Sequence, residues 1–316
     1  MRLVVTGGAG FIGSKFVSSA LDDEYLEIES LTVIDSLTYA GNLKNLAVAS
    51  QDSRYRFVQA DISIHEDLER LIENASHVVN FAAESHVDQS ISNPDKFIRT
   101  NVVGTHNMLE ASLRHGVERF VQISTDEVYG SNAQIAWDES TSLDPSSPYS
   151  ASKASGDIFS LAYFKTFGLD VVITRACNNY GPTQHPEKLL PKTITRLSRG
   201  LTVPIYGDGK NEREWIHVSD HVQGIIRALR EGKPGEIYNL GSGESLSNLE
   251  IVSMICKILN KPMDLLTFVE DRLGHDLKYQ INSSKAKREI GYDTEVSLEE
   301  GLLETVNWYL ENPNWW

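Results

Sequence analysis

The stretch Arg2-Leu3-Val4-Val5-Thr6-Gly7-Gly8-Ala9-Gly10-Phe11-Ile12-Gly13 joins an apolar run directly to a glycine-rich turn. The run at 2–6 predicts a β-strand, and the residues from Ser14 to about Leu21 predict a helix. Glycines at positions 7, 10 and 13 leave the backbone bare between the two elements. A diphosphate can then approach the helix N-terminus, where free N–H groups and the helix dipole favour negative charge. The stretch therefore predicts a strand–turn–helix unit that binds a nucleotide.

A second apolar run, residues 31–34, ends in Asp35. Asp35 follows Gly13 by about 20 residues, the spacing at which a carboxylate in such a unit binds the adenosine ribose. A carboxylate there repels a 2′-phosphate, so the predicted cofactor is NAD rather than NADP. The alternative is a phosphate loop for another nucleotide, but the Gly-Lys-Ser/Thr ending of ATP and GTP loops is absent from the sequence.

Strand-like and helix-like segments continue to alternate along the chain. Apolar runs predict strands at 56–58, 77–81, 119–124 and 171–174, and helical patterns lie at 64–73, at 94–115 and from Tyr149 onward. This alternation is typical of an α/β fold with a doubly wound parallel (Rossmann) sheet, which binds its ligand beyond the C-terminal ends of the strands. Residues at or just past those ends outline one crevice: Asp61, Ala82, Ala83, Glu84, Thr125 and Asn178.

The pattern changes after Asn178, where residues 179–191 are rich in turn formers and hydrogen-bonding side chains. A strand at 215–217, a helix at 219–231 and a strand at 236–240 are expected to return to the sheet. Further helices are predicted at 247–259, 283–290 and 298–311. We therefore expect an NAD-binding domain at 1–178 and 215–240, and a smaller, mostly helical substrate domain at 179–214 and 241–316.

The composition narrows the classes of function. A formal net charge of −15 argues against binding a nucleic-acid backbone, although a locally positive pocket could still take a phosphorylated small molecule. Cys177 and Cys256 lack the paired spacing of metal ligands, so no metal site is predicted. The N-terminal residues carry no signal pattern, and no apolar run approaches membrane-spanning length. We expect a cytoplasmic protein with no membrane or nucleic-acid partner.

Five groups able to perform chemistry lie between Thr125 and Lys153. Thr125, Asp126 and Glu127 follow a predicted strand, while Tyr149 and Lys153 are four residues apart and share one helix face. A phenol with a pKa near 10 is a poor base at pH 7, but an ammonium and a positively charged nicotinamide ring could lower that pKa by about three units. Tyr149 could then remove a hydroxyl proton during hydride transfer to NAD, with Thr125 bonded to the same oxygen. A lone Tyr-x-x-x-Lys is more often a helix surface pair, and the upstream dinucleotide unit favours catalysis here.

Together these motifs resemble the extended short-chain dehydrogenase/reductase superfamily. More narrowly, the chain resembles the dTDP-glucose 4,6-dehydratases over essentially its whole length. The matching stretches are 38–42, 82–88, 124–130, 178–182, 186–189, 213–215 and 271–276. The Thr-Asp-Glu-Val-Tyr-Gly string at 125–130 is the specific one, because related epimerases and decarboxylases usually lack the Asp-Glu pair. The alternatives are an NAD-dependent UDP-sugar epimerase or decarboxylase, and a non-catalytic NAD-binding protein.

The resemblance implies a hydro-lyase that acts on a sugar nucleotide, dTDP-glucose. The expected reaction is oxidation at C4, elimination of water across C5 and C6, and hydride return to C6, which gives dTDP-4-keto-6-deoxy-glucose. The C4 ketone acidifies the C5 proton, and the resemblance assigns the elimination to Asp126 as acid and Glu127 as base. It also implies a homodimer formed through the helices near 94–115 and 149–167.

The resemblance carries binding roles onto matching positions. Around NAD it implies Gly7, Gly10, Phe11, Ile12, Gly13, Asp35, Ser36, Leu37, Thr38, Asp61, Ile62, Ala82, Ala83, Glu84, Ser85, His86, Thr100, Tyr149, Lys153 and Asn179. Around the sugar nucleotide it implies His86, Thr125, Asp126, Glu127, Asn178, Lys188, Leu189, Pro204, Ile205, Tyr206, Arg213, Asn248, Asp271, Arg272, Gly274 and His275. Lys188, Arg213 and Arg272 could neutralise a diphosphate, and residues 204–206 could form an apolar wall for a pyrimidine. The chain departs from the family at Leu273, where Pro is common, and in its short segment between Gly130 and Tyr149.

Overall fold

The computed structural model describes residues 1–131, 135–271 and 276–315. The predicted roles of Arg272, Gly274 and His275, and the departure at Leu273, fall outside the described residues. Within the described chain, no helix is both long and apolar enough to cross a membrane.

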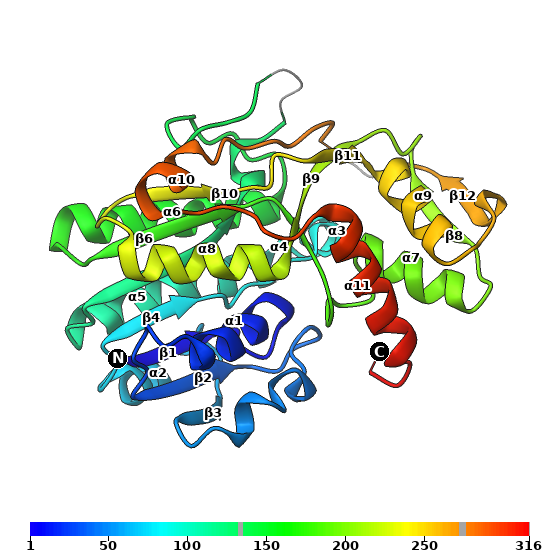
Figure 1. Cartoon of the computed structure of the whole chain (residues 1–316). Coiled ribbons are helices and arrows are strands. Elements are labelled where there is room, and N and C mark those ends of the chain that lie inside the picture. The colour runs from blue at the N-terminus through cyan, green and yellow to red at the C-terminus, as the bar shows by residue number, and fades with distance from the viewer. Residues whose placement is uncertain (132–134, 272–275, 316) are drawn as a thin grey trace.

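A seven-stranded sheet forms the centre of the protein (Figure 1). Its strand order is β10-β6-β5-β4-β1-β2-β3, and every neighbouring pair is parallel. This confirms the predicted doubly wound sheet: β2 and β3 are added on one side of β1, and β4, β5, β6 and β10 on the other. The strands are β1 Arg2–Thr6, β2 Ser30–Asp35, β3 Tyr55–Gln59, β4 His77–Asn80, β5 Arg119–Thr125, β6 Val171–Ala176 and β10 Ile237–Leu240.

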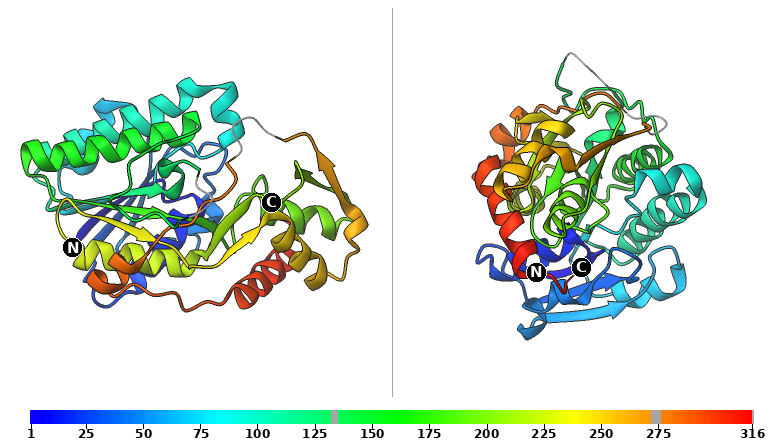
Figure 2. Two further views of the ribbon diagram at one scale, coloured as in Figure 1. Left: turned by 90° about the horizontal axis from the view of Figure 1, so that it is seen from above. Right: turned by 90° about the vertical axis from the view of Figure 1, so that its right-hand side faces the viewer.

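Helices cover both faces of the sheet, as the view from above in Figure 2 shows. Because successive side chains of a strand point to opposite faces, Leu3 and Val5 join one hydrophobic core and Val4 joins the other. The first core lies under α1 Phe11–Asp22, α8 Val218–Glu231 and α10 Ser284–Ile290. The second lies under α2 His65–Ile72, α5 Thr105–Arg114 and α6 Pro148–Phe167.

The helical stretch predicted at about 94–115 is confirmed, and it contains a change of helix type. The segment divides into α4 Pro94–Phe97, a π-helical segment η3 Ile98–Gly104 and α5, and it follows a short helix, α3 Val87–Ser92. A π-helical segment widens the turn, but hydrophobic periodicity over a short window does not distinguish it from an α-helix. Pro94 at the first position of α4 suits a helix start, because proline has no N–H to leave unpaired.

The strand expected to return at 215–217 is also placed differently. β9 Glu212–His217 pairs with β7 Asn178–Tyr180 and β11 Ser245–Ser247 in a separate three-stranded sheet, and only β10 joins the central sheet. An apolar run identifies a strand but does not identify its pairing partner.

Beyond one end of the central sheet lie further helices (Figure 1), and buried side chains among them form a third hydrophobic core. Three helices contribute to it: α7 Leu189–Ser198, α9 Asn248–Ile258 and α11 Leu298–Glu311. A two-stranded parallel sheet, β8 Val203–Tyr206 with β12 Leu266–Val269, packs beside them. Four short 3₁₀ segments complete the described elements: η1 Leu43–Leu46, η2 Ala49–Gln51, η4 Asp126–Tyr129 and η5 Met263–Leu265.

Candidate active site

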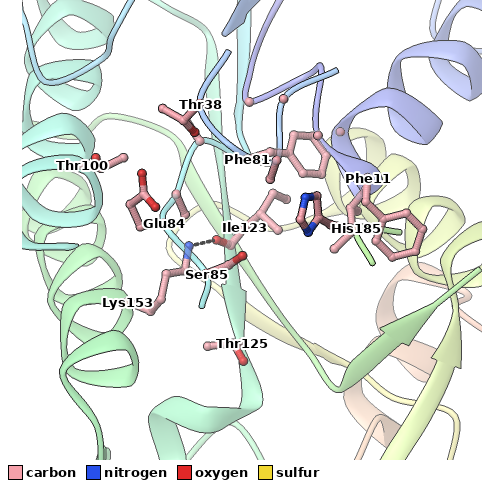
Figure 3. A pocket seen from close by; sticks show the side chains of 18 of the residues that line it. Phe11, Thr38, Phe81, Glu84, Ser85, Thr100, Ile123, Thr125, Lys153 and His185 are labelled. Carbon is pink, nitrogen blue, oxygen red and sulfur yellow. Dashed lines mark hydrogen bonds between the residues drawn. The ribbon is translucent and has the colours of Figure 1, made fainter. Parts of the chain in front are cut away.

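A cavity of about 530 Å³ opens at the C-terminal ends of the central strands. The glycine turn and the ends of β2 and β4 line one part of it, and Thr125, Tyr149 and Lys153 line another. Figure 3 shows side chains from these separate elements facing one another across the cavity. The structure therefore brings the predicted dinucleotide loop and the predicted catalytic groups into one site.

The glycine turn has no room for side chains. Gly7 has φ of +66°, and a Cβ there would lie 2.6 Å from the backbone nitrogen of Ala82. A Cβ at Gly13 would lie 2.3 Å from the carbonyl oxygen of Gly7. The turn thus packs backbone against backbone where α1 begins, and this leaves the helix N-terminus open to a phosphate.

Asp35, at the end of β2, holds this turn in place. Its carboxylate accepts hydrogen bonds from the N–H of Ala9 at 2.9 Å and from the N–H of Leu37 at 2.8 Å. Burial raises its pKa, while the two backbone N–H groups oppose that shift. Asp35 lines the cavity as predicted for a ribose ligand, but it also joins the second strand to the phosphate loop.

Thr125 and Asp126 form a buried polar pair at the end of β5. The Thr125 hydroxyl donates to Asp126 Oδ1 at 3.2 Å and accepts from the Glu127 N–H at 3.3 Å. Asp126 is only 1% exposed. Burial first, and then the neighbouring charges of Glu127 and Glu214, raise the pKa of Asp126 well above its usual value. The raised pKa favours the protonated form of Asp126, the form that a general acid needs.

Tyr149 and Lys153 both lie on α6 and line the cavity. The helix begins with a reciprocal capping box between Ser147 and Ser150, which fixes the first turn and with it Tyr149. The Lys153 ammonium donates to the Ile123 carbonyl at 2.6 Å, the hydrogen bond drawn in Figure 3. Burial lowers the pKa of Lys153 to about 8.

In the protein alone, the surroundings of Tyr149 disfavour its phenolate. Burial raises the pKa of the phenol, the charge of Glu127 raises it further, and a hydrogen bond with Thr125 opposes the shift. The predicted lowering of this pKa requires the Lys153 ammonium and a positively charged nicotinamide ring together, and in the protein alone the ammonium donates to the Ile123 carbonyl. Forming the phenolate thus requires positive charge beyond what the side chains around Tyr149 supply.

Most of the predicted cofactor residues line the cavity, the exceptions being Leu37 and His86. His86 instead caps α3, where its Nδ1 accepts from the Gln89 N–H, and its Nε2 lies 3.4 Å from a Glu187 carboxylate oxygen. Among the predicted substrate residues, the cavity is lined by Thr125, Asp126, Glu127, Asn178 and Lys188.

The other predicted substrate residues lie outside this cavity: Leu189, Pro204, Ile205, Tyr206, Arg213, Asn248 and Asp271. Ile205 is 2% exposed and belongs to the third core, so the expected apolar wall is reduced to its two neighbours on β8. Arg213 is also buried, donates to the Asp276 carbonyl at 2.9 Å and stacks over the Tyr279 ring at 4.4 Å.

Several lining residues were not predicted. His221 on α8 holds Asn179, with 2.8 Å between His221 Nδ1 and Asn179 Oδ1, and Gln184 Nε2 donates to the Asn179 carbonyl at 2.8 Å. The polar character of 179–191 pointed to Gln184, His185 and Glu187, whereas no local pattern pointed to His221. The remaining additions are Ile34, Ala40, Gly41, Ala60, Phe81, Lys96, Arg99, Ile123, Ser124, Ala176 and Cys177.

Buried polar atoms facing the cavity are available to a ligand. Within the described chain, Asn178 Oδ1 and His221 Nε2 have no hydrogen-bond partner. Buried polar groups are normally paired, so such atoms at a cavity wall suit a ligand that carries polar groups of its own. Among the described residues, no group of three or more His, Cys, Asp or Glu side chains could hold a metal ion.

Residues 4–305 match the protein family described as GDP-mannose 4,6 dehydratase. The chain belongs to this family. It is 47% identical to a dTDP-glucose 4,6-dehydratase from Actinoplanes sp., with 100% of each chain covered. Among solved structures, it is similar to the dTDP-glucose 4,6-dehydratase DesIV from Streptomyces venezuelae with NAD and TYD bound: the identity is 50%, the TM-score 0.99, and 100% of this chain and 99% of that one are covered.

The fold by itself does not separate reactions within this group. A UDP-glucose 4-epimerase from Thermotoga maritima, solved with UDP-glucose, has a TM-score of 0.92 at 30% identity and covers 99% of this chain. The resemblance to dTDP-glucose 4,6-dehydratases, first based on the motifs, is confirmed by relatives that are nearly half identical over the full length.

Proposed function

We propose that the protein is an NAD-dependent dTDP-glucose 4,6-dehydratase. The observation that carries the proposal is the arrangement of Thr125, Asp126 and Glu127 at the end of β5, opposite Tyr149 and Lys153 in one cavity. A phenol and an ammonium serve a reversible oxidation, and two carboxyl groups with different environments serve an elimination. The full-length similarity to dTDP-glucose 4,6-dehydratases supports the same assignment.

The residues suited to NAD are those of the glycine turn and Asp35. The bare backbone at Gly7 and Gly13 admits a diphosphate at the start of α1, and the Asp35 carboxylate lies in the cavity wall where β2 ends. When bound, NAD would supply the hydride acceptor at C4 and the hydride donor at C6. Its positively charged ring would also provide the charge that the Tyr149 phenol lacks in the protein alone.

The side chains would divide the remaining work. Tyr149 would accept the proton of the C4 hydroxyl while Thr125 binds the same oxygen, and Lys153 would favour the phenolate through its charge. Glu127 would then remove the C5 proton, and Asp126 would give its proton to the departing C6 hydroxyl as water leaves. The raised pKa of the buried Asp126 carboxyl fits the second role.

The proposal is tested by incubating the purified protein with dTDP-glucose and with UDP-glucose side by side, and identifying the products by mass and NMR. We expect a 4-keto-6-deoxy product from dTDP-glucose. An epimerised sugar, or no product, would refute the assignment. The double variant Asp126→Asn/Glu127→Gln separates the steps: elimination should vanish while oxidation at C4 persists.

We further infer a homodimer in which α6 and η3 form the contact. Apolar side chains are exposed on both: Ile158 is 59% exposed, Phe159 39% and Ile98 52%. Ile158→Asp should yield a monomer in size-exclusion chromatography with light scattering, because a charge would be buried in the interface. Val48→Asp is the matched control, since Val48 is 79% exposed away from these helices. A monomeric unaltered protein would refute the inference.

A further inference from the structure

The segment that follows α11 contacts the N-terminal part of the chain. The Trp315 indole donates to Asn45 Oδ1 at 3.0 Å, and Lys44 Nζ donates to the Asn314 carbonyl at 3.3 Å. In the right-hand view of Figure 2, the red end of the chain runs over the blue N-terminal elements. Residues some 270 positions apart are thus joined beside the cofactor cavity.

Asn45 also contacts the glycine turn. Its side-chain amide donates to the Ala9 carbonyl at 3.0 Å, and the Asn42 N–H donates to the same oxygen at 3.0 Å. Because Trp315 occupies Asn45 Oδ1, the amide is held with its N–H₂ group toward Ala9. The N–H of Ala9 donates to the Asp35 carboxylate. The tip of the turn is therefore fixed from two directions.

The same end of the chain also contacts a second part of the cavity lining. The Tyr309 hydroxyl donates to the Gln184 carbonyl, and Gln184 in turn donates to the Asn179 carbonyl at 2.8 Å. Gln184 and Asn179 both line the cavity. The Trp315 ring packs edge-on against Trp308 at 5.1 Å and against Tyr309 at 6.5 Å, so the two supports share one aromatic cluster.

We propose that this aromatic cluster, Trp308, Tyr309 and Trp315, is a strap that holds the cofactor cavity in its binding shape. Trp315 is a positioning residue: it acts on the glycine turn through Asn45 and does not line the cavity itself. A turn that is already ordered loses less conformational freedom when it binds a diphosphate, so the strap increases cofactor affinity. The inference rests on the proposed binding of NAD.

The test compares Trp315→Phe with Trp308→Phe in the full chain. Trp315→Phe keeps a ring in the cluster but removes the donor to Asn45. Trp308→Phe also keeps a ring and leaves the hydrogen bonds from Trp315 through Asn45 to Ala9 intact, so it is the control for packing and should leave NAD affinity unchanged. We expect Trp315→Phe to weaken NAD binding about 2- to 10-fold by calorimetry, as loss of one hydrogen bond would. Turnover at saturating NAD should stay within about twofold of the unaltered protein, because the catalytic groups are untouched.

Asn45→Ala removes the side chain that links Trp315 to Ala9. It should weaken NAD binding by a similar factor, and the double variant Asn45→Ala/Trp315→Phe should show little further loss, because both changes break one chain of contacts. Equal NAD affinity in Trp315→Phe, Trp308→Phe and the unaltered protein would overturn the strap alone. An unaltered protein that binds no NAD would overturn the proposed function together with it.

Discussion

Replacing Asp126 by Asn should make the enzyme slower and the fold more stable. Asn has nearly the same shape and can still accept from the Thr125 hydroxyl, as Asp126 Oδ1 does at 3.2 Å. It has no acidic proton to give to the leaving C6 hydroxyl. Loss of a general acid typically costs about 10²- to 10⁴-fold in rate.

The gain in stability follows from the buried proton. The unfolded chain loses the Asp126 proton near the ordinary value of 3.8, whereas burial and the charges of Glu127 and Glu214 keep it bound in the folded protein to higher pH. Between these two pKa values folding takes up a proton, so the native protein loses stability as pH rises. The slope is about 1.4 kcal/mol per pH unit for one group. Asn does not titrate and avoids this loss.

Two measurements check the reasoning. Product formation from dTDP-glucose gives the rate, and urea denaturation from pH 4 upward gives the free energy of unfolding of both proteins. The stability of Asp126→Asn relative to the unaltered protein should increase with pH across that window. A difference in stability that is independent of pH would show that Asp126 ionises normally. A rate within about tenfold of the unaltered enzyme would exclude Asp126 as the acid.

Three further changes test other parts of the site and fold. Lys153 should lose its charge as pH rises through about 8, so turnover should fall above that pH, and Lys153→Met should reduce turnover about 100-fold or more. Between pH 8 and 10.5 only the unfolded chain keeps the Lys153 proton, so the free energy of unfolding of the unaltered protein relative to Lys153→Met should rise with pH. Arg175→Met breaks a buried ion pair, in which Arg175 Nε lies 2.9 Å from Asp157 Oδ2, and should lower the free energy of unfolding by about 3–5 kcal/mol in urea denaturation. The double variant Asp157→Leu/Arg175→Met should lose less, because it leaves no unpaired buried charge, and an additive loss would count against the pair. Gly13→Ala places a Cβ 2.3 Å from the Gly7 carbonyl and should weaken NAD binding about 5- to 150-fold in equilibrium dialysis, and unchanged binding would mean that the turn can move.

The sequence predicted the parts of this protein that depend on local pattern. Alternating apolar runs and helical periods identified the strands of the parallel sheet, because side-chain periodicity follows directly from backbone geometry. Glycines at 7 and 13 predicted a bare turn, and the structure shows backbone where their side chains would be. The glycine turn, Asp35 and Thr125 line one cavity because the C-terminal ends of parallel strands lie at one edge of a sheet.

Only the tertiary structure decided which distant groups become partners. β9 lies between segments that return to the central sheet, yet it pairs with β7 and β11. Lys153 bonds the Ile123 carbonyl, and Trp315 reaches Asn45 across nearly the whole length of the chain. Burial, which depends on everything packed around a group, raises the pKa of Asp126 and lowers that of Lys153 from the values of the free side chains. Sequence order records neither pairing nor burial, because both arise from segments that meet only in the folded chain.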